Sequence, residues 1–235
     1  MGVVTFLFTD LEGSTRLWEK HPEAMREALA VHDRLLEDLV EEHGGRIFKH
    51  TGDGICAVFD SAGDALEASA DIQRRFADET LPEVGRLRLR IGVHAGEAEE
   101  RDGDFFGTAL NRTARLMSAA HGGQALVSLV AARLADDARL QLRDLGEHRL
   151  RDLGRPERVF QLVVDGLPHD FLPIRTLDHA RPPSAHHFLR RARPGTSRAG
   201  KAHSWSPPGD GDRCRWFGQD PAGPPGHRQP PARVP

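Results

Sequence analysis

The stretch VVTFLFTDLEGST, residues 3–15, decides the fold, because an apolar strand runs directly into polar chain that contains glycine. The run VVTFLF is rich in β-branched and aromatic residues, which is typical of a central strand buried on both faces. Asp10 follows at the end of that strand, where the apolar pattern predicts no carboxylate. Residues 13–15 then lead into a short helix at residues 16–18, and the free backbone N–H groups of a helix N-terminus suit a phosphate. That last signal is weak, since the stretch has neither the lysine of a P-loop nor the spacing of a dinucleotide fingerprint.

Outward from this strand, the spacing of apolar residues predicts further helices and strands. An apolar stripe of helical period begins at Pro22 and ends before Gly44. Two short β-prone runs flank the sequence TGDG, which predicts a hairpin with Asp53 at its tip. The order of elements predicts an α+β fold, an antiparallel sheet with helices on one face. The expected helices are residues 22–43, 62–77, 105–120 and 129–134, and the expected strands are residues 46–50, 55–59, 87–99, 124–128, 145–150 and 158–164.

The composition, 38% hydrophobic and 29% charged among 235 residues, is that of an ordinary water-soluble chain. No stretch approaches the roughly 18 consecutive apolar residues of a membrane span, and the N-terminus lacks the basic start of a signal peptide. We therefore expect a cytoplasmic protein without a membrane partner. Cys56 and Cys214 lie far apart in the chain, so any bound metal should be held by oxygen or imidazole.

The charge is divided unevenly between the two parts of the chain. Residues 166–235 contain 11 Lys and Arg against 5 Asp and Glu, and 13 of the 16 prolines, whereas residues 1–165 contain 21 Lys and Arg against 30 Asp and Glu. A segment with so many prolines and so few aliphatic residues buries little apolar area, so we expect residues 166–235 to be disordered and residues 1–165 to form the folded domain. The basic residues of the tail are scattered and match no nucleic-acid-binding motif, which makes nucleic acid an improbable partner.

Asp10 and Asp53 are candidate metal ligands. Asp10 ends a strand, Asp53 lies in the hairpin expected beside it, and hard cations such as Mg²⁺ prefer carboxylate oxygens. The alternative is structural: Asp10 would cap the following turn, and Asp53 would fill a hairpin position that favours aspartate next to glycine.

The expected helix at residues 105–120 places Asn111 and Arg115 on one face, because they are four residues apart. An arginine can stabilise charge that develops on phosphorus, and an amide can orient a sugar. The alternative is a solvated polar face. His94 is expected to be structural, since no second histidine is spaced to bind a metal with it.

Four motifs in this order resemble those of the class III nucleotidyl cyclases, the adenylate and guanylate cyclase family: FTDLEGST, FKHTGDG, RIGVH and DFFGTALNRTAR. The resemblance covers about residues 3–164. It implies a ferredoxin-like antiparallel sheet with helices packed on it. It also implies attack of a ribose 3'-hydroxyl on the α-phosphate of the same nucleotide, with release of pyrophosphate.

The first motif implies the metal and phosphate ligands. Asp10 would bind metal with the Leu11 carbonyl nearby, and Gly13, Ser14 and Thr15 would surround the triphosphate.

The second and third motifs imply further ligands for the metal and for the phosphates. Asp53 would be the other ligand of two Mg²⁺ or Mn²⁺ ions, and Arg90 would bind phosphate. Lys49 and Asp104 would read the base, and this combination is the adenine type, whereas guanine-type members have Glu and Cys there. The chemistry agrees, since adenine offers an amine donor to Asp104 and a ring acceptor to Lys49.

The fourth motif implies that Asn111 holds the ribose and Arg115 stabilises the transition state. One residue departs from the family pattern: Arg151 stands where a lysine usually contacts the triphosphate, and an arginine fork places phosphate oxygens differently, so we expect altered turnover.

The resemblance therefore implies an adenylate cyclase that converts ATP to 3',5'-cyclic AMP. In this family the metal half and the base-reading half of a site lie on different subunits, which implies a homodimer with two equivalent shared sites. The alternative is a catalytically weak or silent nucleotide-binding or dimerisation module of a signalling regulator. The GG[DE]EF signature of a diguanylate cyclase is absent.

Overall fold

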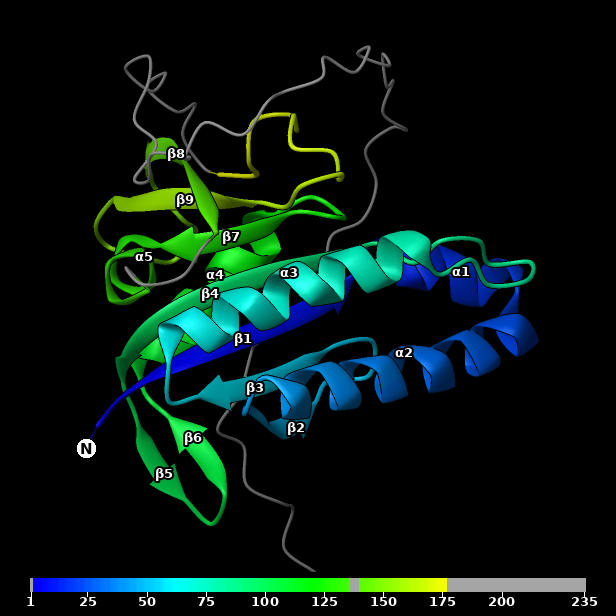
Figure 1. Ribbon diagram of the computed structural model, residues 1–235, viewed down its shortest axis with the longest axis horizontal. Helices are drawn as coiled ribbons and strands as arrows, with labels where there is room; N and C mark the ends of the chain where they lie inside the picture. Colours follow the sequence, from blue (N-terminus) through cyan, green and yellow to red (C-terminus); the bar gives the residue numbers. More distant parts are fainter. Residues whose placement is uncertain (1, 136–139, 177–235) are drawn as a thin grey trace, which may run out of the picture. The chain divides into compact units, whose positions relative to one another are not determined.

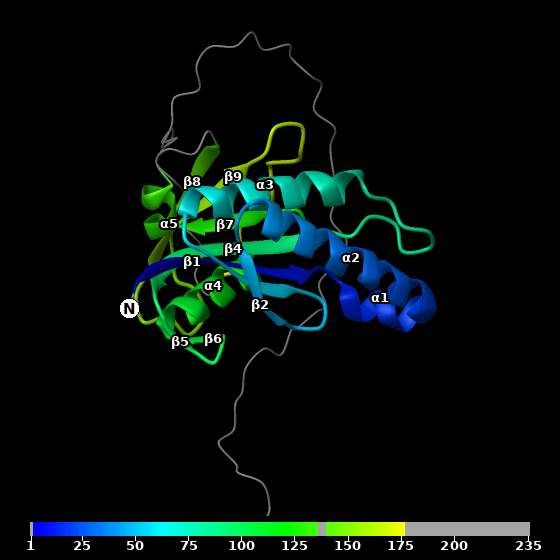
Figure 2. The same ribbon diagram turned by 60° about the horizontal axis from the view of Figure 1, so that its bottom comes forward.

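The computed structural model describes residues 2–135 and 140–176, which form a seven-stranded sheet with helices on both faces (Figures 1 and 2). The strands lie in the order β2-β3-β1-β4-β7-β9-β8. They are β1 (Val3–Leu11), β2 (Arg46–His50), β3 (Ile55–Phe59), β4 (Leu89–Glu97), β7 (Ala125–Ser128), β8 (Gln141–His148) and β9 (Glu157–Val163). The helices are α1 (Ser14–Lys20), α2 (Pro22–Glu42), α3 (Ala62–Asp78), α4 (Thr108–Ala119) and α5 (Leu129–Leu134).

The expected fold class, α+β with a largely antiparallel sheet, is confirmed. β1 pairs antiparallel with β3 on one side and with β4 on the other, and its pairing with β4 runs the whole length of both strands. One feature of the sheet was not expected: β4 and β7 pair in parallel, because the chain crosses over through α4 between them.

Helices cover both faces of the sheet, so the expectation of helices on one face was wrong. Leu7 and Leu11 of β1 belong to the core beneath α2 and α3, whereas Phe6 and Phe8 pack on the opposite face against residues of α4. Figure 2 shows α2 and α3 above the sheet and α4 below it. Because successive residues of a strand point to opposite faces, the uninterrupted apolar run of β1 supplies a core to each.

α4 lies unusually close to β4 at Gly92. A Cβ at this position would lie 2.5 Å from the backbone nitrogen of Met117 and 2.6 Å from the carbonyl oxygen of Thr113. No residue with a side chain fits without a backbone shift, so glycine sets the separation between the helix and the sheet.

Two local expectations were also wrong. The segment expected to be polar loop and helix start forms a two-stranded ribbon, β5 (Glu99–Arg101) and β6 (Asp104–Phe106), whose turn contains Asp102 and Gly103 with positive φ. α4 therefore begins only at Thr108. β8 begins at residue 141 rather than 145, since its first residues pair with the end of β9.

The packed domain extends beyond residue 165, the boundary expected from composition. Ile174 is buried in a cluster with residues of α4, β7 and β9, and the Arg175 backbone nitrogen donates to the Ala119 carbonyl at 3.0 Å. The rest of the expected tail, residues 177–235, lies outside the described residues. Among residues 2–135 and 140–176, no helix is long and apolar enough to cross a membrane.

Candidate active site

Backbone hydrogen bonds fix the tip of the β2–β3 hairpin to the end of β1 and bring Asp53 beside Asp10. The Leu11 nitrogen donates to the Asp53 carbonyl at 3.1 Å. The Ile55 nitrogen donates to Thr9 Oγ1 at 3.0 Å. The hairpin tip is therefore held by the strand that carries the first carboxylate, and the structure brings together the two aspartates that the sequence singled out.

Gly54 permits this close approach. A Cβ on Gly54 would lie 2.0 Å from the Thr9 carbonyl oxygen, a contact that no side chain can make. Burial is the main cause that raises the pKa of the Asp10 carboxyl, and the negative charge of Asp53 adds to this effect.

Asp10 is a buried carboxylate with an arginine partner. Asp10 lies opposite Arg90 in the β1–β4 pairing, and Arg90 Nη2 donates to Asp10 Oδ2. Only 5% of the Asp10 side chain and 6% of the Arg90 side chain are exposed. Burial raises the pKa of Asp10 to about 6, although the Arg90 guanidinium opposes that rise. Arg90, expected to bind phosphate, is here engaged with the first metal-ligand candidate.

The donor set at this position suits Mg²⁺ or Mn²⁺. Asp10 and Asp53 supply two carboxylates, and the Leu11 carbonyl is the backbone donor implied by the sequence. Within residues 2–135 and 140–176, no three or more His, Cys, Asp or Glu side chains form a metal-binding group. Mg²⁺ is commonly held by one or two carboxylates together with water and substrate phosphates, so two carboxylates fit such an ion and do not fit an enclosed zinc site.

Lys49 and Asp104, the two expected base-reading residues, form an ion pair. Lys49 Nζ lies 3.4 Å from Asp104 Oδ2, and the two side chains are 50% and 39% exposed. The neighbouring rings of Phe48 and Phe105 make an edge contact with centroids 5.1 Å apart. Phe48 precedes Lys49 in the sequence, and Phe105 follows Asp104. The contact between the two rings therefore brings β2 and β6 together at the ion pair.

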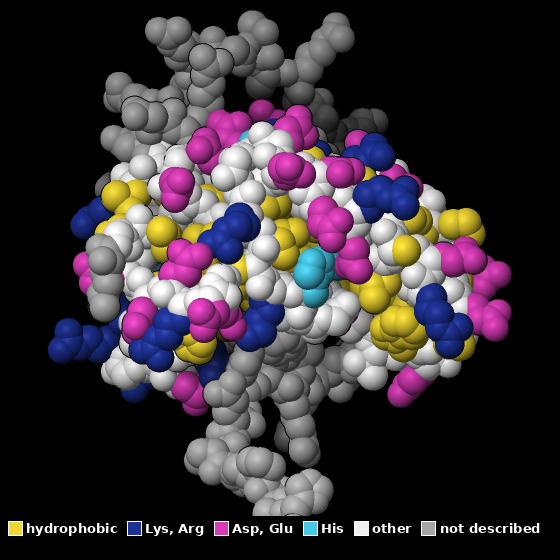
Figure 3. Space-filling view, turned by 90° about the horizontal axis from the view of Figure 1, so that it is seen from below, with side chains coloured by type: hydrophobic (Ala, Val, Ile, Leu, Met, Phe, Trp, Pro, Cys, Tyr) yellow, Lys and Arg dark blue, Asp and Glu magenta, His cyan; other side chains and the backbone are white. Residues whose placement is uncertain are grey.

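β2 and the β5–β6 ribbon lie at the lower end of the view in Figure 1. Figure 3 shows that side of the domain, where acidic, basic and hydrophobic side chains are interspersed. The side therefore presents no extended surface of a single charge.

Asn111 and Arg115 lie on α4, as expected. Asn111 is exposed, and Arg115 is directed to the β8–β9 connection, where its Nη2 lies 2.7 Å from Asp152 Oδ2. Arg151 Nε lies 3.8 Å from the same carboxylate oxygen. Asp152 has a positive φ of 59°, so the backbone turns sharply where it meets the two arginines.

Within one chain, Arg115 faces away from the paired aspartates. Asp53 belongs to the β2–β3 hairpin at one edge of the sheet, whereas Asp152 belongs to the β8–β9 connection at the other edge. The ion pair with Asp152 directs Arg115 toward the second edge. Apart from the Lys49–Asp104 pair and residues 13–15, the structure thus groups the candidate residues into two sets: Asp10, Asp53 and Arg90 form one, and Asn111, Arg115 and Arg151 form the other.

Glu12 connects the first set to parts of the chain that the sequence analysis did not assign to the site. Its Oε1 accepts from the Gly122 nitrogen at 3.0 Å and from Arg175 Nη2 at 3.2 Å, and its Oε2 lies 2.9 Å from Arg88 Nη2. These contacts lower the pKa of the Glu12 carboxyl although partial burial opposes that shift. Gly13 follows with φ 76° and begins α1, whose first two residues are Ser14 and Thr15.

His94 is a buried structural histidine, as expected. Its Nδ1 lies 2.9 Å from Ser128 Oγ, so it joins β4 to the start of α5. Burial lowers the pKa of His94 to about 4, and the charge of Arg112 adds to this effect. The ring is therefore neutral at neutral pH.

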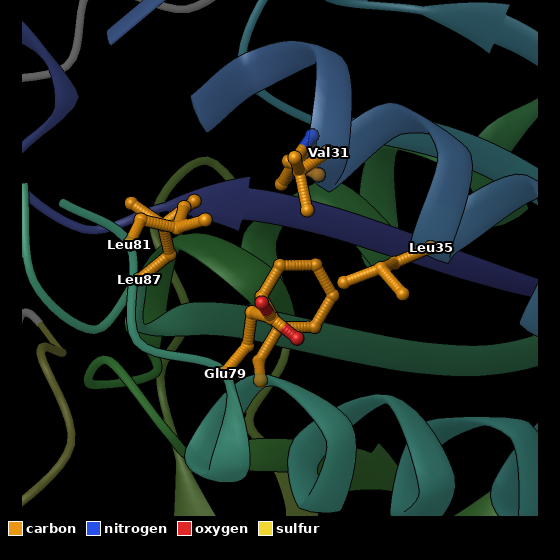
Figure 4. Close-up of a pocket in the computed structure, with 7 residues that line it drawn as sticks. Val31, Leu35, Glu79, Leu81 and Leu87 are labelled. Carbon is orange, nitrogen blue, oxygen red and sulfur yellow. The ribbon is translucent and has the colours of Figure 1, made fainter. Parts of the chain in front are cut away.

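A small pocket lies on the other side of the sheet, between α2 and the end of α3 (Figure 4). Its walls are mainly apolar, and the buried His32 ring and Glu79 are its polar members. Asp10 faces the α4 side of the sheet, so this pocket lies apart from the paired carboxylates. The pocket is lined by Val31, His32, Leu35, Phe76, Glu79, Leu81 and Leu87.

Residues 1–164 match the family model of the adenylate and guanylate cyclase catalytic domain. The chain is 42% identical over 182 residues to the uncharacterized protein Rv0891c of Mycobacterium tuberculosis, covering 74% of this chain and 61% of that protein. It is 31% identical over 204 residues to a receptor-type adenylate cyclase of Trypanosoma congolense, covering 68% of this chain and 27% of that protein. The chain thus spans about three fifths of the first relative and about a quarter of the second.

Solved structures resemble the fold over the same region. The structure of an adenylate cyclase of Trypanosoma brucei in its monomeric state superposes with a TM-score of 0.68 at 28% identity, and the match covers 76% of this chain and 96% of that one. The adenylate/guanylate cyclase/hydrolase of Silicibacter pomeroyi superposes with a TM-score of 0.61 at 32% identity and covers 70% of this chain and 98% of that one.

Proposed function

Since this chain belongs to the adenylate and guanylate cyclase catalytic domain family, we propose that it is an adenylate cyclase, which converts ATP to 3',5'-cyclic AMP and pyrophosphate. One observation carries the proposal: the pinned β2–β3 hairpin places Asp53 beside the buried Asp10. Two convergent carboxylates are what phosphoryl chemistry assisted by divalent cations requires. A capping role for Asp10 alone would not need the hairpin that carries Asp53 to be bonded to the end of β1.

The reaction forms a bond between the ribose O3' and the α-phosphorus and breaks the bond to the β-phosphate oxygen, and pyrophosphate leaves with the electron pair. A divalent cation, when bound by Asp10 and Asp53, supplies positive charge that favours ionisation of the 3'-hydroxyl. Asn111 orients the ribose, and Arg115 donates to the phosphate oxygens on which negative charge increases. Gly13, Ser14 and Thr15 at the start of α1 bind the triphosphate through backbone and hydroxyl groups. No side-chain nucleophile is required.

Adenine is the preferred base because Lys49 and Asp104 supply one donor and one acceptor. The ion pair between them shows that both side chains reach the same point in space. Asp104 accepts from the exocyclic amine of adenine, and Lys49 donates to a ring nitrogen. Guanine presents a carbonyl where adenine has that amine, so the Asp104 carboxylate would face an acceptor at this position instead of a donor.

The complete site is formed by two copies of the chain in this proposal. Arg115 points toward the sheet edge opposite the paired aspartates, so one chain does not assemble both sets of residues around one nucleotide. A two-fold arrangement brings the α4 of each copy to the carboxylates of the other, which gives two equivalent shared sites.

A product assay tests the proposed activity. Purified chain is incubated with ATP or GTP and with Mg²⁺ or Mn²⁺, and cyclic nucleotide is quantified, with Asp10→Ala as control. We expect cyclic AMP from ATP in the wild type, at least about tenfold less product from GTP, and none above background in the control. Binding of ATP without product would instead favour a catalytically silent nucleotide-binding module.

A mixing experiment tests the shared site. Chains with Asp53→Ala and chains with Arg115→Ala are each inactive as homodimers, but a heterodimer of the two retains one intact site. Equal mixing after subunit exchange should restore about a quarter of wild-type activity, because half of the dimers are heterodimers with one of two sites. If no activity returns while subunit exchange is demonstrated, the shared-site arrangement is excluded.

A further inference from the structure

We propose that Arg88 and Arg175, which Glu12 holds next to Asp10, bind the polyphosphate of the nucleotide and so extend the phosphate site into the chain after β9. This inference rests on the proposed function, since it assigns new residues to the same site. It also changes the role of residues 166–176, which the composition had placed in a tail.

The first step is the register of the sheet. Asp10 lies opposite Arg90, and the same register continues just beyond the ends of β1 and β4, where the Glu12 nitrogen donates to the Arg88 carbonyl at 3.0 Å. Residues two apart in a strand lie on the same face, about 7 Å from each other. The Glu12–Arg88 pair therefore lies on the same face as the Asp10–Arg90 pair and next to it, at a distance that a chain of phosphates can span.

The second step is the path of the chain after β9. Phe171 stacks on the His121 ring at a centroid distance of 6.3 Å, and His121 Nε2 lies 3.1 Å from the Pro173 carbonyl. Ile174 is buried beside α4, and Arg175 then reaches Glu12 Oε1. These contacts anchor residues 171–175 along the end of α4, so the position of Arg175 beside Glu12 is supported by the packing of the residues that precede it.

The third step is charge. Glu12 carries one negative charge and contacts two guanidinium groups, those of Arg88 and Arg175. Arg88 and Arg175 are each 45% exposed at the side chain, which leaves part of each guanidinium accessible to a ligand. A guanidinium carries several N–H donors in a planar fork, and phosphate oxygens are good acceptors for them.

The experiment measures polyphosphate binding directly. Binding of inorganic tripolyphosphate with Mg²⁺ is followed by calorimetry for the wild type, Arg88→Gln, Arg175→Gln and Arg175→Lys. We expect the dissociation constant to rise about fivefold for each glutamine variant and less than twofold for Arg175→Lys, because the charge is kept. In a cyclase assay the same glutamine variants should raise KM for ATP and leave kcat within about twofold.

The matched control is Arg143→Gln. Arg143 also holds the chain after β9, because its Nη1 lies 2.9 Å from Asp170 Oδ1, and 44% of its side chain is exposed. Among the residues that the structure describes, it forms no ion pair or hydrogen bond with Glu12 or Asp10. Its variant should bind tripolyphosphate as the wild type does. Thermal melting identifies any variant that fails to fold, and Arg88→Gln then tests the same cluster from β4.

Equal affinities for Arg175→Gln, Arg88→Gln and Arg143→Gln would overturn the inference, as would a fall in kcat at unchanged KM. A wild-type chain that binds tripolyphosphate but makes no cyclic AMP would instead contradict the proposed function alone. The two failures are therefore distinguishable.

Discussion

Asp10 and Arg90 form an ion pair at the middle of the sheet, with 5% and 6% of their side chains exposed, whereas Arg115 and Asp152 form one with 23% and 62% exposed. The first pair is fixed by strand register and by the pinned hairpin, and the second joins a helix to a turn at the sheet edge. A buried pair cannot rearrange without a desolvation cost, while an exposed pair exchanges readily with water or a ligand. The carboxylate set is thus preformed, and the α4 set remains adaptable.

Asp10→Ala should show the largest effect. It removes one metal ligand and leaves Arg90 buried without its carboxylate, so we expect cyclase activity to fall at least about 100-fold and the free energy of unfolding to fall by about 3 kcal/mol. Lys49→Ala, which breaks an exposed pair, should lower the free energy of unfolding by less than about 1 kcal/mol. Urea denaturation and the product assay measure both quantities. Equal destabilisation by the two variants would show that burial gives the Asp10–Arg90 pair no greater effect on stability than an exposed pair has.

Gly54→Ala tests the hairpin that completes the carboxylate set. The added Cβ meets the Thr9 carbonyl oxygen at 2.0 Å, so the tip must shift away from β1. We expect a loss of about 2 to 3 kcal/mol in the free energy of unfolding, together with weaker Mn²⁺ binding. Gly154→Ala is the control, because a Cβ there meets nothing within 4 Å. Wild-type stability in Gly54→Ala would show that the tip is not pinned.

His94 reports on the environment of the same face of β4, four residues beyond Arg90. Its pKa in the fold is about 4, below the usual 6.5, so the unfolded chain binds more protons between those values. The part of the free energy of unfolding that depends on a neutral His94 ring is fully present above pH 6.5 and is lost as the pH falls toward 4. Between pH 7 and pH 5 we expect His94→Gln to lose about 2 kcal/mol less free energy of unfolding than the wild type. Parallel pH profiles for the two proteins would show that the ring is hydrated.

Asp152→Ala should show the smallest effect on stability. The ion pair with Arg115 is largely exposed on the aspartate side, so its loss should change the free energy of unfolding by less than about 1 kcal/mol. Added salt should also lower the melting temperature of the wild type slightly more than that of Asp152→Ala, because only the wild type has this ion pair to screen. A loss above 2 kcal/mol would mean that the α4 set is as rigid as the carboxylate set.

Much of the first set could be predicted from the sequence because its signals are local. Asp10 interrupts an apolar strand, and Asp53 lies between glycines in a short hairpin, so each stands out within its own segment. The hydrophobic pattern also predicted the α+β class and the order of the helices and strands other than the β5–β6 ribbon. The fold class was confirmed, whereas the catalytic roles remain predictions.

The features that the sequence did not predict depend on contacts between distant segments. Glu12 and Arg175 are 163 residues apart, and neither interrupts a periodic pattern. The β5–β6 ribbon consists largely of charged residues with low β-propensity, and tertiary contact with β2 overrides that preference. The position of α4 on the second face follows from apolar residues on both sides of β1, which a single amphipathic pattern cannot distinguish from full burial.

The contact between α4 and Gly92 limits how the protein can move. With Met117 and Thr113 backbone atoms seated against the strand, α4 cannot slide or tilt without breaking the packing of the sheet. The sheet and α4 are therefore expected to move together as one rigid body. A change that advances Arg115 toward a nucleotide must come from its own side-chain rotation or from reorientation of an entire protomer.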